Sequence, residues 1–236
     1  MTYVISDIHG RFDEFLKMLK KIDFKDTDTL YILGDAVDRG PGSIKCLQYI
    51  MKQPNMHMLI GNHEYMMLDV LSSPEIKFYR RCWHGNGGDI TEYQYNELSN
   101  SEKKDIFEFI KNLPSNFDIT VNGQRYILAH AYPQYKYYGQ PVPMINGYEN
   151  ETEFIVWERG IPPEIDDTII IFGHTPVFHY SDKNPCEIVS FDDTRINIDC
   201  GAAYPVHGGR LGCMRLDDNK EFYVPINGFG TSSGEE

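Results

Sequence analysis

Residues 1–60 alternate between short apolar runs and longer amphipathic segments. The runs Tyr3–Ile5, Thr29–Leu33 and Met56–Ile60 are rich in aliphatic residues and predict strands. Between them, apolar residues recur at helical spacing over 12–22 and 44–51, which predicts a helix in each segment. An alternation of strand and helix favours parallel strands with the helices packed outside them.

The pattern changes between about Leu71 and Leu113. This region is polar and helix-prone in pieces, and the segment Trp83-His84-Gly85-Asn86-Gly87-Gly88 interrupts it. We expect it to form a helical cap inserted between sheet elements, with its aromatic residues in the core of the cap. These aromatic residues are Phe78, Tyr79, Trp83, Tyr93 and Tyr95.

The rest of the chain is mostly strand. Phe117–Val121 and Arg125–Leu128 flank Asn122-Gly123, a pair that suits a type I′ turn, so these runs predict a hairpin. Residues 132–165 are rich in Pro, Gly and Tyr and predict a long loop over the sheet edge, with one helical turn near Phe154–Arg159. Further short strands are predicted at 168–172, 187–191, 195–199, 213–216 and 221–224.

Together these elements predict an α/β fold, called α+β in some schemes, in which two packed mixed β-sheets are flanked by helices in an α/β/β/α sandwich. A chain of 236 residues is long enough for one large core. We expect a single domain over residues 1–229, with the cap as an insertion at about 71–113. The small, polar and acidic tail over residues 230–236 is expected to be disordered.

Charge and cysteine usage narrow the function classes. The formal net charge of −13 at pH 7 argues against binding to nucleic acid or to an anionic membrane. No apolar run approaches the length of a membrane span. The five cysteines are scattered and form no Cys-x-x-Cys pair, which favours free thiols over disulfides or a zinc ribbon. Because the first strand leaves no room for a signal peptide, we expect a cytoplasmic protein.

Short polar clusters stand where the apolar runs end. Asp, His and Asn recur in them, and these residues bind divalent metals through oxygen and imidazole nitrogen. Repetition of this arrangement predicts a site assembled at the carboxyl edge of a sheet. The clusters are Asp7-Ile8-His9-Gly10, Gly34-Asp35-Ala36-Val37-Asp38-Arg39-Gly40, Gly61-Asn62-His63-Glu64, His130 and Gly173-His174-Thr175.

The spacing suggests how these side chains could share two metal ions. Asp7 and His9 are two positions apart, and on extended backbone they would point to the same side and could bind one ion. The carboxylate of Asp35 could bridge this ion to a second one. Oxygen and nitrogen ligands without thiolate favour Mn²⁺, with Fe or Zn as alternatives. The ligands of the second ion would be Asp35, Asn62, His130 and His174.

Other residues of the same clusters suit catalysis rather than metal binding. Two ions about 3.5–4 Å apart can clamp the attacking and leaving oxygens of an in-line displacement. His63 is then a candidate to protonate the leaving oxygen, with Asp38 orienting its imidazole. Arg39 and Arg159 are candidates to bind phosphate oxygens, because a guanidinium matches them bidentately. A solvated cation at a helix end is the competing interpretation of Arg159.

The clusters resemble a known family. Taken in order, they are similar to the motifs of the calcineurin-like metallophosphoesterases, and more narrowly to the phosphoprotein-phosphatase branch in its small bacterial and phage form. The resemblance extends along almost the whole chain, to Gly208-Gly209-Arg210-Leu211. The block around Asp35 and the Gly61-Asn62-His63-Glu64 block carry most of it, because Asp-x-His or a single His is a weak signal.

The resemblance implies a β-sandwich with a dinuclear metal site at its edge. By matching position, the first metal would be bound by Asp7, His9 and Asp35. The second would be bound by Asp35, Asn62, His130 and His174. The catalytic pair would be His63 and Asp38. The residues that bind the substrate phosphate would be Arg39, Arg159 and Asn62.

Two departures from the family pattern stand out. Gly173-His174-Thr175-Pro176 lacks the second histidine of the Gly-His-x-His motif that many metallophosphoesterases, including the nucleases, carry. This absence favours the protein-phosphatase branch. Tyr132 stands where relatives usually carry glycine, which changes the shape expected for the substrate mouth.

The function that we expect is that of a metal-dependent phosphomonoester hydrolase. The substrate would be a phosphorylated protein, carrying phosphoserine, phosphothreonine or phosphotyrosine, or a small phosphate ester. The first alternative is a symmetrical bis(5′-nucleosyl)-tetraphosphatase, because bacterial enzymes of that kind share these blocks and resemble the Asn86-Gly87-Gly88 segment. The second is a non-catalytic scaffold, although such proteins usually lose ligands or the acid histidine. No nucleic-acid or membrane partner is expected, and the sequence leaves the oligomeric state open.

Overall fold

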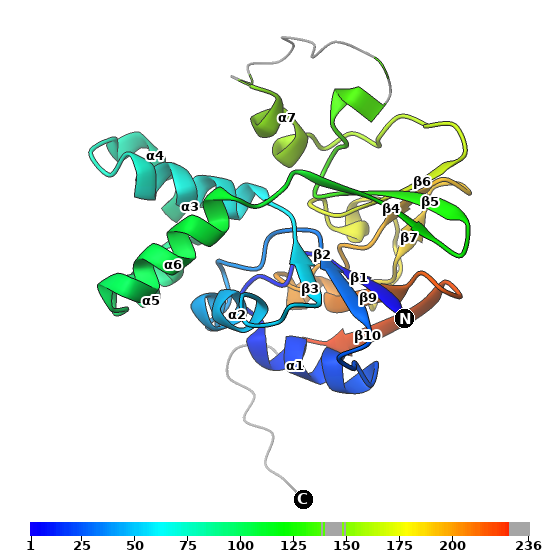
Figure 1. The fold of residues 1–236 in the computed structure, drawn as a ribbon, viewed down its shortest axis with the longest axis horizontal. Helices are drawn as coiled ribbons and strands as arrows, with labels where there is room; N and C mark the ends of the chain where they lie inside the picture. The colour runs from blue at the N-terminus through cyan, green and yellow to red at the C-terminus, as the bar shows by residue number, and fades with distance from the viewer. Residues whose placement is uncertain (138, 140–147, 149, 227–236) are drawn as a thin grey trace, which may run out of the picture.

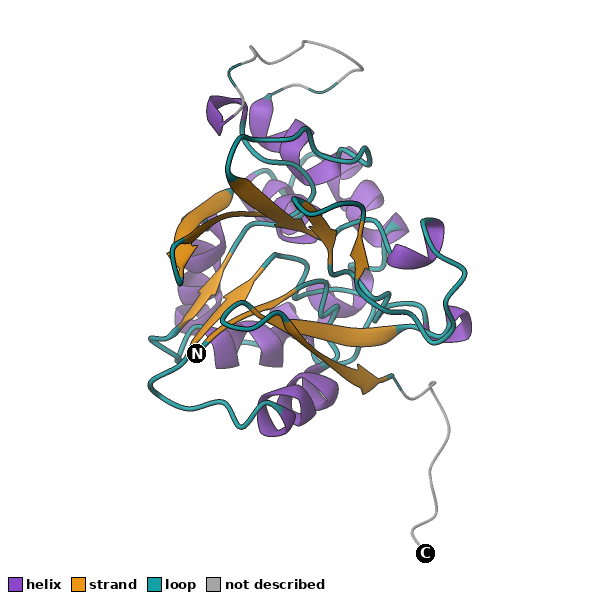
Figure 2. Cartoon of the chain, turned by 90° about the vertical axis from the view of Figure 1, so that its right-hand side faces the viewer, coloured by secondary structure: helices purple, strands orange, loops and turns teal. Residues whose placement is uncertain are grey.

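Two five-stranded β-sheets pack face to face in the computed structural model, which describes residues 1–137, 139, 148 and 150–226 (Figure 2). The first sheet contains, in order across it, β10 (Lys220–Pro225), β9 (Arg210–Arg215), β1 (Thr2–Ile5), β2 (Thr29–Ile32) and β3 (Met56–Met58). The second contains β4 (Asn116–Val121), β5 (Gln124–Ala129), β6 (Thr168–Phe172), β8 (Arg195–Asn197) and β7 (Val189–Ser190).

Helices lie above, below and to one side of this pair of sheets in the view of Figure 1. The α-helices are α1 (Phe12–Lys21), α2 (Ser43–Ile50), α3 (Asn62–Ser72), α4 (Lys77–Gly85), α5 (Asp89–Asn96), α6 (Asn100–Lys111) and α7 (Glu151–Trp157). Short 3₁₀-helices occur at η1 (Tyr135–Tyr137), η2 (Val177–His179) and η3 (Pro205–His207). The predicted fold class is confirmed: two mixed sheets pack together with helices in an α/β fold.

Each sheet contains three adjacent parallel strands. β1, β2 and β3 run in one direction, with Ile5 opposite Ile32 and Ile32 opposite Met58. β5, β6 and β8 are likewise parallel, with Leu128 opposite Ile171. The carboxyl ends of parallel strands meet at one edge, so the segments that follow these strands are brought together.

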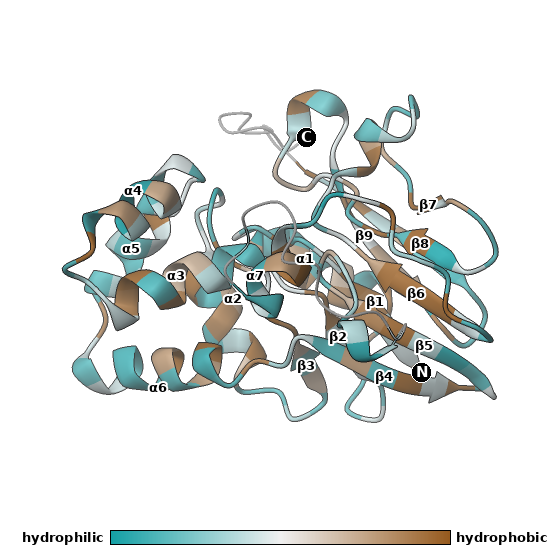
Figure 3. Ribbon diagram, turned by 90° about the horizontal axis from the view of Figure 1, so that it is seen from above, coloured by the Kyte–Doolittle hydropathy of each residue, from teal (hydrophilic) through white to brown (hydrophobic). Residues whose placement is uncertain are grey.

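β1 is buried on both faces, which explains its continuous apolar sequence. Tyr3 and Ile5 belong to the cluster that includes Phe15 of α1, on the helical side of the first sheet. Val4 points the other way and packs with Leu128 of the second sheet. Alternate residues of a strand face opposite sides, so a single strand joins the helical layer to the interface between the sheets. Figure 3 shows hydrophobic residues concentrated on these central strands.

The cap lies to one side of the sheets and contains α4, α5 and α6 (Figure 1). Its core holds Trp83 and Tyr95, which are buried. Phe78 and Tyr93, in contrast, are 59% and 69% exposed, so the prediction that all cap aromatics lie in its core is wrong for these two. α3 begins at the sheet edge and extends into the cap. The pattern of apolar residues does not predict this helix, because its first turn is formed by the polar residues Asn62–Glu64.

Two other predicted elements differ from the structure. β7 spans only Val189–Ser190, because the amide of Cys186 donates to Gly208 and that of Ile188 to the Tyr223 hydroxyl, instead of to a neighbouring strand. The helical turn predicted near 154–159 is α7, which ends at Trp157. The predicted tail over 230–236 and part of the predicted long loop lie outside the described residues. Within the described residues, no helix is long and apolar enough to cross a membrane.

Candidate metal centre and active site

The polar clusters converge at the edge where the parallel strands end. Asp7 follows β1, Asp35 follows β2, and Asn62 follows β3. His130 comes directly after β5, and His174 follows β6. All of these side chains are buried, although each is polar or ionisable. Strand order therefore assembles residues that are far apart in the sequence into one compact group.

The backbone at these strand ends is left-handed rather than extended. Asp7, His9 and Asp35 have φ values of 51°, 46° and 50°. The extended geometry predicted for Asp7 and His9 is therefore wrong. Their side chains still converge, because His9 Nε2 lies 3.9 Å from Asp7 Oδ1. Left-handed backbone at a non-glycine residue costs about 1–3 kcal/mol and persists where the surrounding structure enforces it, which is common at functional sites.

Asp35 lies between two sets of imidazoles. Its Oδ2 is 3.7 Å from His9 Nε2, and its Oδ1 is 3.5 Å from His130 Nε2. The two oxygens of one carboxylate thus face different histidines. This geometry suits a carboxylate that bridges two cations.

Backbone carbonyls fix the orientation of two imidazoles. His9 Nδ1 donates to the Val37 carbonyl at 3.1 Å, and His130 Nδ1 donates to the Leu33 carbonyl at 2.8 Å. In a neutral imidazole, this leaves the Nε2 lone pair directed at the centre, as in metal-binding histidines. Burial, aided by the Arg39 charge, holds the pKa of His9 well below its usual range, and burial does the same for the pKa of His174.

Asn62 completes a second group of acceptors. Its Oδ1 lies 3.0 Å from His130 Nε2 and 2.9 Å from His174 Nδ1. Because His130 Nδ1 already donates elsewhere, a neutral His130 places a lone pair opposite an amide oxygen. Two facing acceptors are an unfavourable pair unless a cation lies between them.

The donor set therefore fits divalent metal ions. Two groups of buried ligand-type side chains lie with their ligand atoms within 4.8 Å of one another, and both include Asp35. One group adds His9 and His63, and the other adds His130 and His174. Oδ1 of Asp7 is buried without a hydrogen-bond partner and is a further oxygen ligand available beside His9. No cysteine belongs to either group.

His63 is held by a buried carboxylate. Its Nδ1 lies 2.6 Å from Asp38 Oδ2, and the same oxygen accepts a 2.8 Å hydrogen bond from Trp83 Nε1. Burial alone would lower the pKa of His63, but the carboxylates of Asp35 and Asp38 outweigh it and raise the pKa. The environment of His63 thus favours a protonated imidazole, whereas that of His9 favours a neutral one.

Arg39 crosses the front of the centre. Its Nη1 is 3.2 Å from His9 Nε2, and its Nη2 is 3.1 Å from His63 Nε2. The other side of the guanidinium is held by the Asn86 carbonyl, 3.4 Å from Nε, and by the Tyr204 ring, whose centroid is 5.3 Å from Cζ. The guanidinium fork thus faces the space between a candidate ligand and the candidate acid.

Arg159 is placed less tightly. It lies beyond the end of α7 and is exposed, and its Nη1 is 3.5 Å from the Thr175 hydroxyl. The pKa of His174 is lowered mainly by burial and by the charge of His130, and the charge of Arg159 makes a smaller contribution in the same direction. Tyr132, the departure from the family pattern, packs edge-to-face on Phe154 of α7 with ring centroids 5.3 Å apart.

The structure adds two residues that the sequence analysis did not assign. The Glu64 carboxylate accepts hydrogen bonds from the amides of Asp35, Ala36 and Gly61, so it fixes two ligand loops at once. Gly61 allows this close packing, because a Cβ there would lie 2.2 Å from Asp35 Oδ1. Trp83 was assigned only to the cap core. The adjacent Gly-Asn-His-Glu block signals Glu64, but nothing near Trp83 in the sequence signals its contact with Asp38.

Replacement of Trp83 by phenylalanine should lower kcat about tenfold. The change keeps an aromatic ring in the cap core but removes a hydrogen bond to a buried carboxylate, which contributes about 1.5 kcal/mol. Because Trp83 acts through Asp38, the loss should fall on kcat rather than KM, and it should be much smaller in an Asp38→Asn background. Tyr93→Phe, at an exposed cap aromatic, is the matched control. Additive losses in the double variant would contradict this role.

The sequence profile of the calcineurin-like phosphoesterases matches residues 2–202. The chain belongs to this family. The resemblance expected from the clusters is therefore confirmed, and the chain is a metallophosphoesterase, a hydrolase of phosphoric esters. The family depends on a dinuclear metal centre, and the groups that share Asp35 are the candidate ligands in this chain.

Several curated proteins are similar in sequence. Serine/threonine-protein phosphatase 1 of Salmonella typhimurium is 30% identical over 218 residues, which cover 91% of this chain and 91% of that protein. Serine/threonine-protein phosphatase 2 of the same organism is 29% identical over 187 residues, or 73% of this chain and 78% of that protein. The symmetrical bis(5′-nucleosyl)-tetraphosphatase of Salmonella newport is 42% identical over 73 residues, but these are only 30% of this chain and 26% of that enzyme.

Solved structures share the fold. A crystal structure of a proposed diadenosine tetraphosphatase superposes with a TM-score of 0.65 at 18% identity, covering 95% of this chain and 92% of that one. A protein serine/threonine phosphatase from Saccharomyces cerevisiae superposes with a TM-score of 0.58 at 15% identity, covering 96% and 80%. At these identities the likeness concerns the fold alone.

Proposed function

We propose that this chain is a phosphatase that removes phosphoryl groups from serine and threonine side chains of proteins, with phosphotyrosine as a further substrate. The observation that carries the proposal is the buried Asp38–His63 pair facing Arg39 beside the candidate metal ligands. This arrangement combines an acid and a phosphate-binding cation with a metal centre. Similarity to serine/threonine-protein phosphatase 1 along 91% of the chain supports the choice of substrate.

The proposed metal ligands follow from the two groups around Asp35. Asp7, His9 and Asp35 would hold the first ion. The second would be held by Asp35, Asn62, His130 and His174. His63 lies within reach of the first group, yet its raised pKa and its bond to Asp38 suit a proton donor rather than a ligand. Mn²⁺ is the proposed metal, and Fe or Zn are the alternatives that this donor set accepts.

When bound, the two ions would supply Lewis-acid activation of water and charge neutralisation at the phosphoryl group. The chain's own residues would do the rest. Arg39 would bind two phosphoryl oxygens with its guanidinium fork, with Arg159 and Asn62 as further contacts. As water attacks phosphorus and the ester P–O bond breaks, His63 would donate its Nε2 proton to the leaving oxygen. Asp38 would hold the imidazole in position and stabilise its charged form.

A substrate panel tests the proposed function. The metal-stripped protein refilled with Mn²⁺ should hydrolyse p-nitrophenyl phosphate and a phosphothreonine peptide, and the peptide should have the higher kcat/KM. The check is release of inorganic phosphate, with circular dichroism as the control for folding. A folded, Mn²⁺-loaded protein that releases phosphate from neither substrate would contradict the proposal.

The same panel addresses a second candidate. The match to the symmetrical bis(5′-nucleosyl)-tetraphosphatase is 42% identical over 73 residues, which makes diadenosine tetraphosphate the natural competing substrate. Its hydrolysis with a kcat/KM above that of the phosphopeptide would favour this alternative. Because the enzyme would then release nucleoside diphosphates, chromatography of the products separates the two functions directly.

A further inference from the structure

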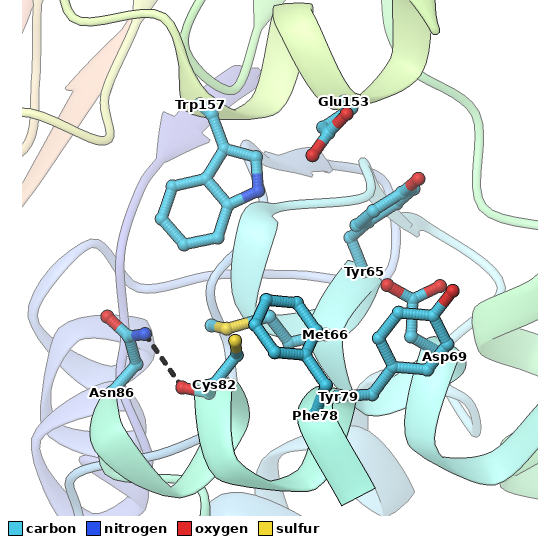
Figure 4. A pocket seen from close by; sticks show the side chains of 9 residues that line it. All are labelled: Tyr65, Met66, Asp69, Phe78, Tyr79, Cys82, Asn86, Glu153 and Trp157. Atoms are coloured by element: carbon cyan, nitrogen blue, oxygen red, sulfur yellow. Dashed lines mark hydrogen bonds between the residues drawn. The ribbon is translucent and has the colours of Figure 1, made fainter. Parts of the chain in front are cut away.

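A cavity of about 340 Å³ opens between α3, α4 and α7 (Figure 4). Neither the proposed metal ligands nor the catalytic pair line it. Its walls come from segments that are far apart in the sequence and meet where the cap approaches α7. The lining residues are Tyr65, Met66, Asp69, Phe78, Tyr79, Cys82, Asn86, Glu153 and Trp157.

This cavity adjoins the candidate active site on two sides. Asn86 lines it, and the carbonyl of Asn86 also accepts the 3.4 Å hydrogen bond from Arg39 Nε. Trp157 lines it as well, and its ring packs edge-to-face on His174 with centroids 6.0 Å apart. A substrate whose phosphate is bound by Arg39 would therefore place its neighbouring groups at the cavity.

The lining has the chemistry of a cation-binding site. Aromatic rings form much of the wall, and Asp69 and Glu153 are its ionisable acids. In Figure 4 the Glu153 carboxylate points into the space between Trp157 and Tyr65. Among the described residues that line the cavity, none is lysine or arginine. Aromatic faces attract cations through the ring quadrupole, by about 0.5–2 kcal/mol, and carboxylates add direct charge complementarity.

The same lining disfavours an anionic occupant. A nucleoside diphosphate leaving group would bring several negative charges close to the carboxylates of Asp69 and Glu153. The formal net charge of −13 adds to this repulsion. The cavity therefore suits a phosphopeptide with a nearby basic residue better than it suits a dinucleoside polyphosphate.

We propose that this cavity is a specificity pocket for a cationic side chain, arginine or lysine, that lies near the phosphorylated residue of a protein substrate. The inference rests on the proposed phosphatase function and assigns a substrate preference to it. Phe78 and Tyr79 would contact the stem of the side chain, while the charged group would lie between Trp157 and the carboxylates. The exposed position of Phe78, at 59%, then reflects a substrate contact rather than a failure of cap packing.

The test uses phosphothreonine peptides that differ only in the residue at one flanking position, which is arginine, alanine or glutamate. When the flanking positions are varied one at a time, one of them should show a clear preference. At that position the kcat/KM of the arginine peptide should be about tenfold above that of the alanine peptide, and the kcat/KM of the glutamate peptide should be below both. A phosphonate analogue of the arginine peptide should show the same preference as an inhibition constant, which measures binding without turnover.

Variants connect this preference to the cavity. Glu153→Gln and Asp69→Asn remove one charge each with little change in size, and each should reduce the arginine-to-alanine ratio to about two- to threefold. Glu75→Gln is the matched control, because it removes an exposed carboxylate that does not line the cavity. It should leave the ratio unchanged. Since each ratio is taken within one variant, differences in total activity between preparations cancel.

Two results would overturn the pocket assignment while leaving the phosphatase function intact. One is hydrolysis of all peptides with no arginine preference at any position. The other is a preference that persists in both the Glu153→Gln and the Asp69→Asn protein. Failure of the phosphatase function itself is distinct, because Mn²⁺-loaded wild-type protein would then release phosphate from none of the peptides. A lower kcat/KM of Glu153→Gln on diadenosine tetraphosphate, without a peptide effect, would instead assign the cavity to a nucleobase.

Discussion

His63→Asn should lower kcat by about 10²–10⁴-fold while both metal ions remain bound. General acid catalysis typically contributes this factor, and the substitution removes the proton donor but leaves the proposed ligands in place. The carboxylates of Asp35 and Asp38 raise the pKa of His63, which favours the protonated imidazole that a general acid requires. The measurement is kcat on a phosphothreonine peptide, combined with metal analysis of the same preparation.

A matched substitution separates this effect from the loss of any histidine. His57→Asn makes the same chemical change at an exposed position of β3 and should leave kcat unaltered. The leaving group offers a second check. An aryl phosphate, whose phenolate leaves more readily than an alkoxide, should lose less activity in His63→Asn than the phosphopeptide does. Equal kcat in wild type and His63→Asn would remove His63 from the mechanism.

Asp35→Asn should abolish binding of the paired ions and reduce kcat/KM by at least about 10³-fold. Asparagine keeps the size of the side chain and one oxygen, but it loses the charge that faces His9 on one side and His130 on the other. The bound ions supply several kcal/mol of transition-state stabilisation, so their loss corresponds to a factor of this size.

Thermal unfolding measures the loss of metal binding in Asp35→Asn without relying on catalytic activity. Mn²⁺ at about a hundred times its Kd should stabilise the wild type by about 2.7 kcal/mol, or raise Tm by about 5–10 °C. The Asp35→Asn protein should show a much smaller increase. Asp105→Asn, at an exposed position of α6, is the charge-matched control and should respond as the wild type does. An unchanged Mn²⁺ response in Asp35→Asn would show that the carboxylate does not bridge the ions.

The outline of the centre could be predicted because it depends on strand order. Apolar runs mark β1 and β2, and the polar residues Asp7 and Asp35 stand directly after them. Parallel strands bring their carboxyl ends to one edge, so residue type and position were sufficient to group the candidate ligands. The same reasoning applies to His130 and His174, which follow β5 and β6.

Local backbone conformation could not be obtained in this way. Asp7 and His9 were expected on extended backbone, but both have positive φ values. The conformation is set by long-range contacts, including the hydrogen bond from the His9 amide to the Asp35 carbonyl. Such contacts leave no trace in a local pattern of apolar and polar residues.

Side-chain contacts between separate helices and strands could not be predicted from the sequence either. The expectation that Trp83 lies in the cap core was correct, but it does not reveal that the indole donates to Asp38. Likewise, Phe78 could not be distinguished from a core residue until α7 was placed opposite α4. Pairings of this kind depend on how the cap packs against the sheets, which composition and periodicity do not specify.

The central claim is a centre of two ions that share Asp35, and metal analysis during Mn²⁺ titration of the stripped wild-type protein tests it most directly. Bound metal, measured by mass spectrometry after gel filtration, should reach two ions per chain, with phosphatase activity rising in step with the second. A folded protein that is fully active with one ion per chain, or that retains activity after stripping and in excess chelator, would contradict the account.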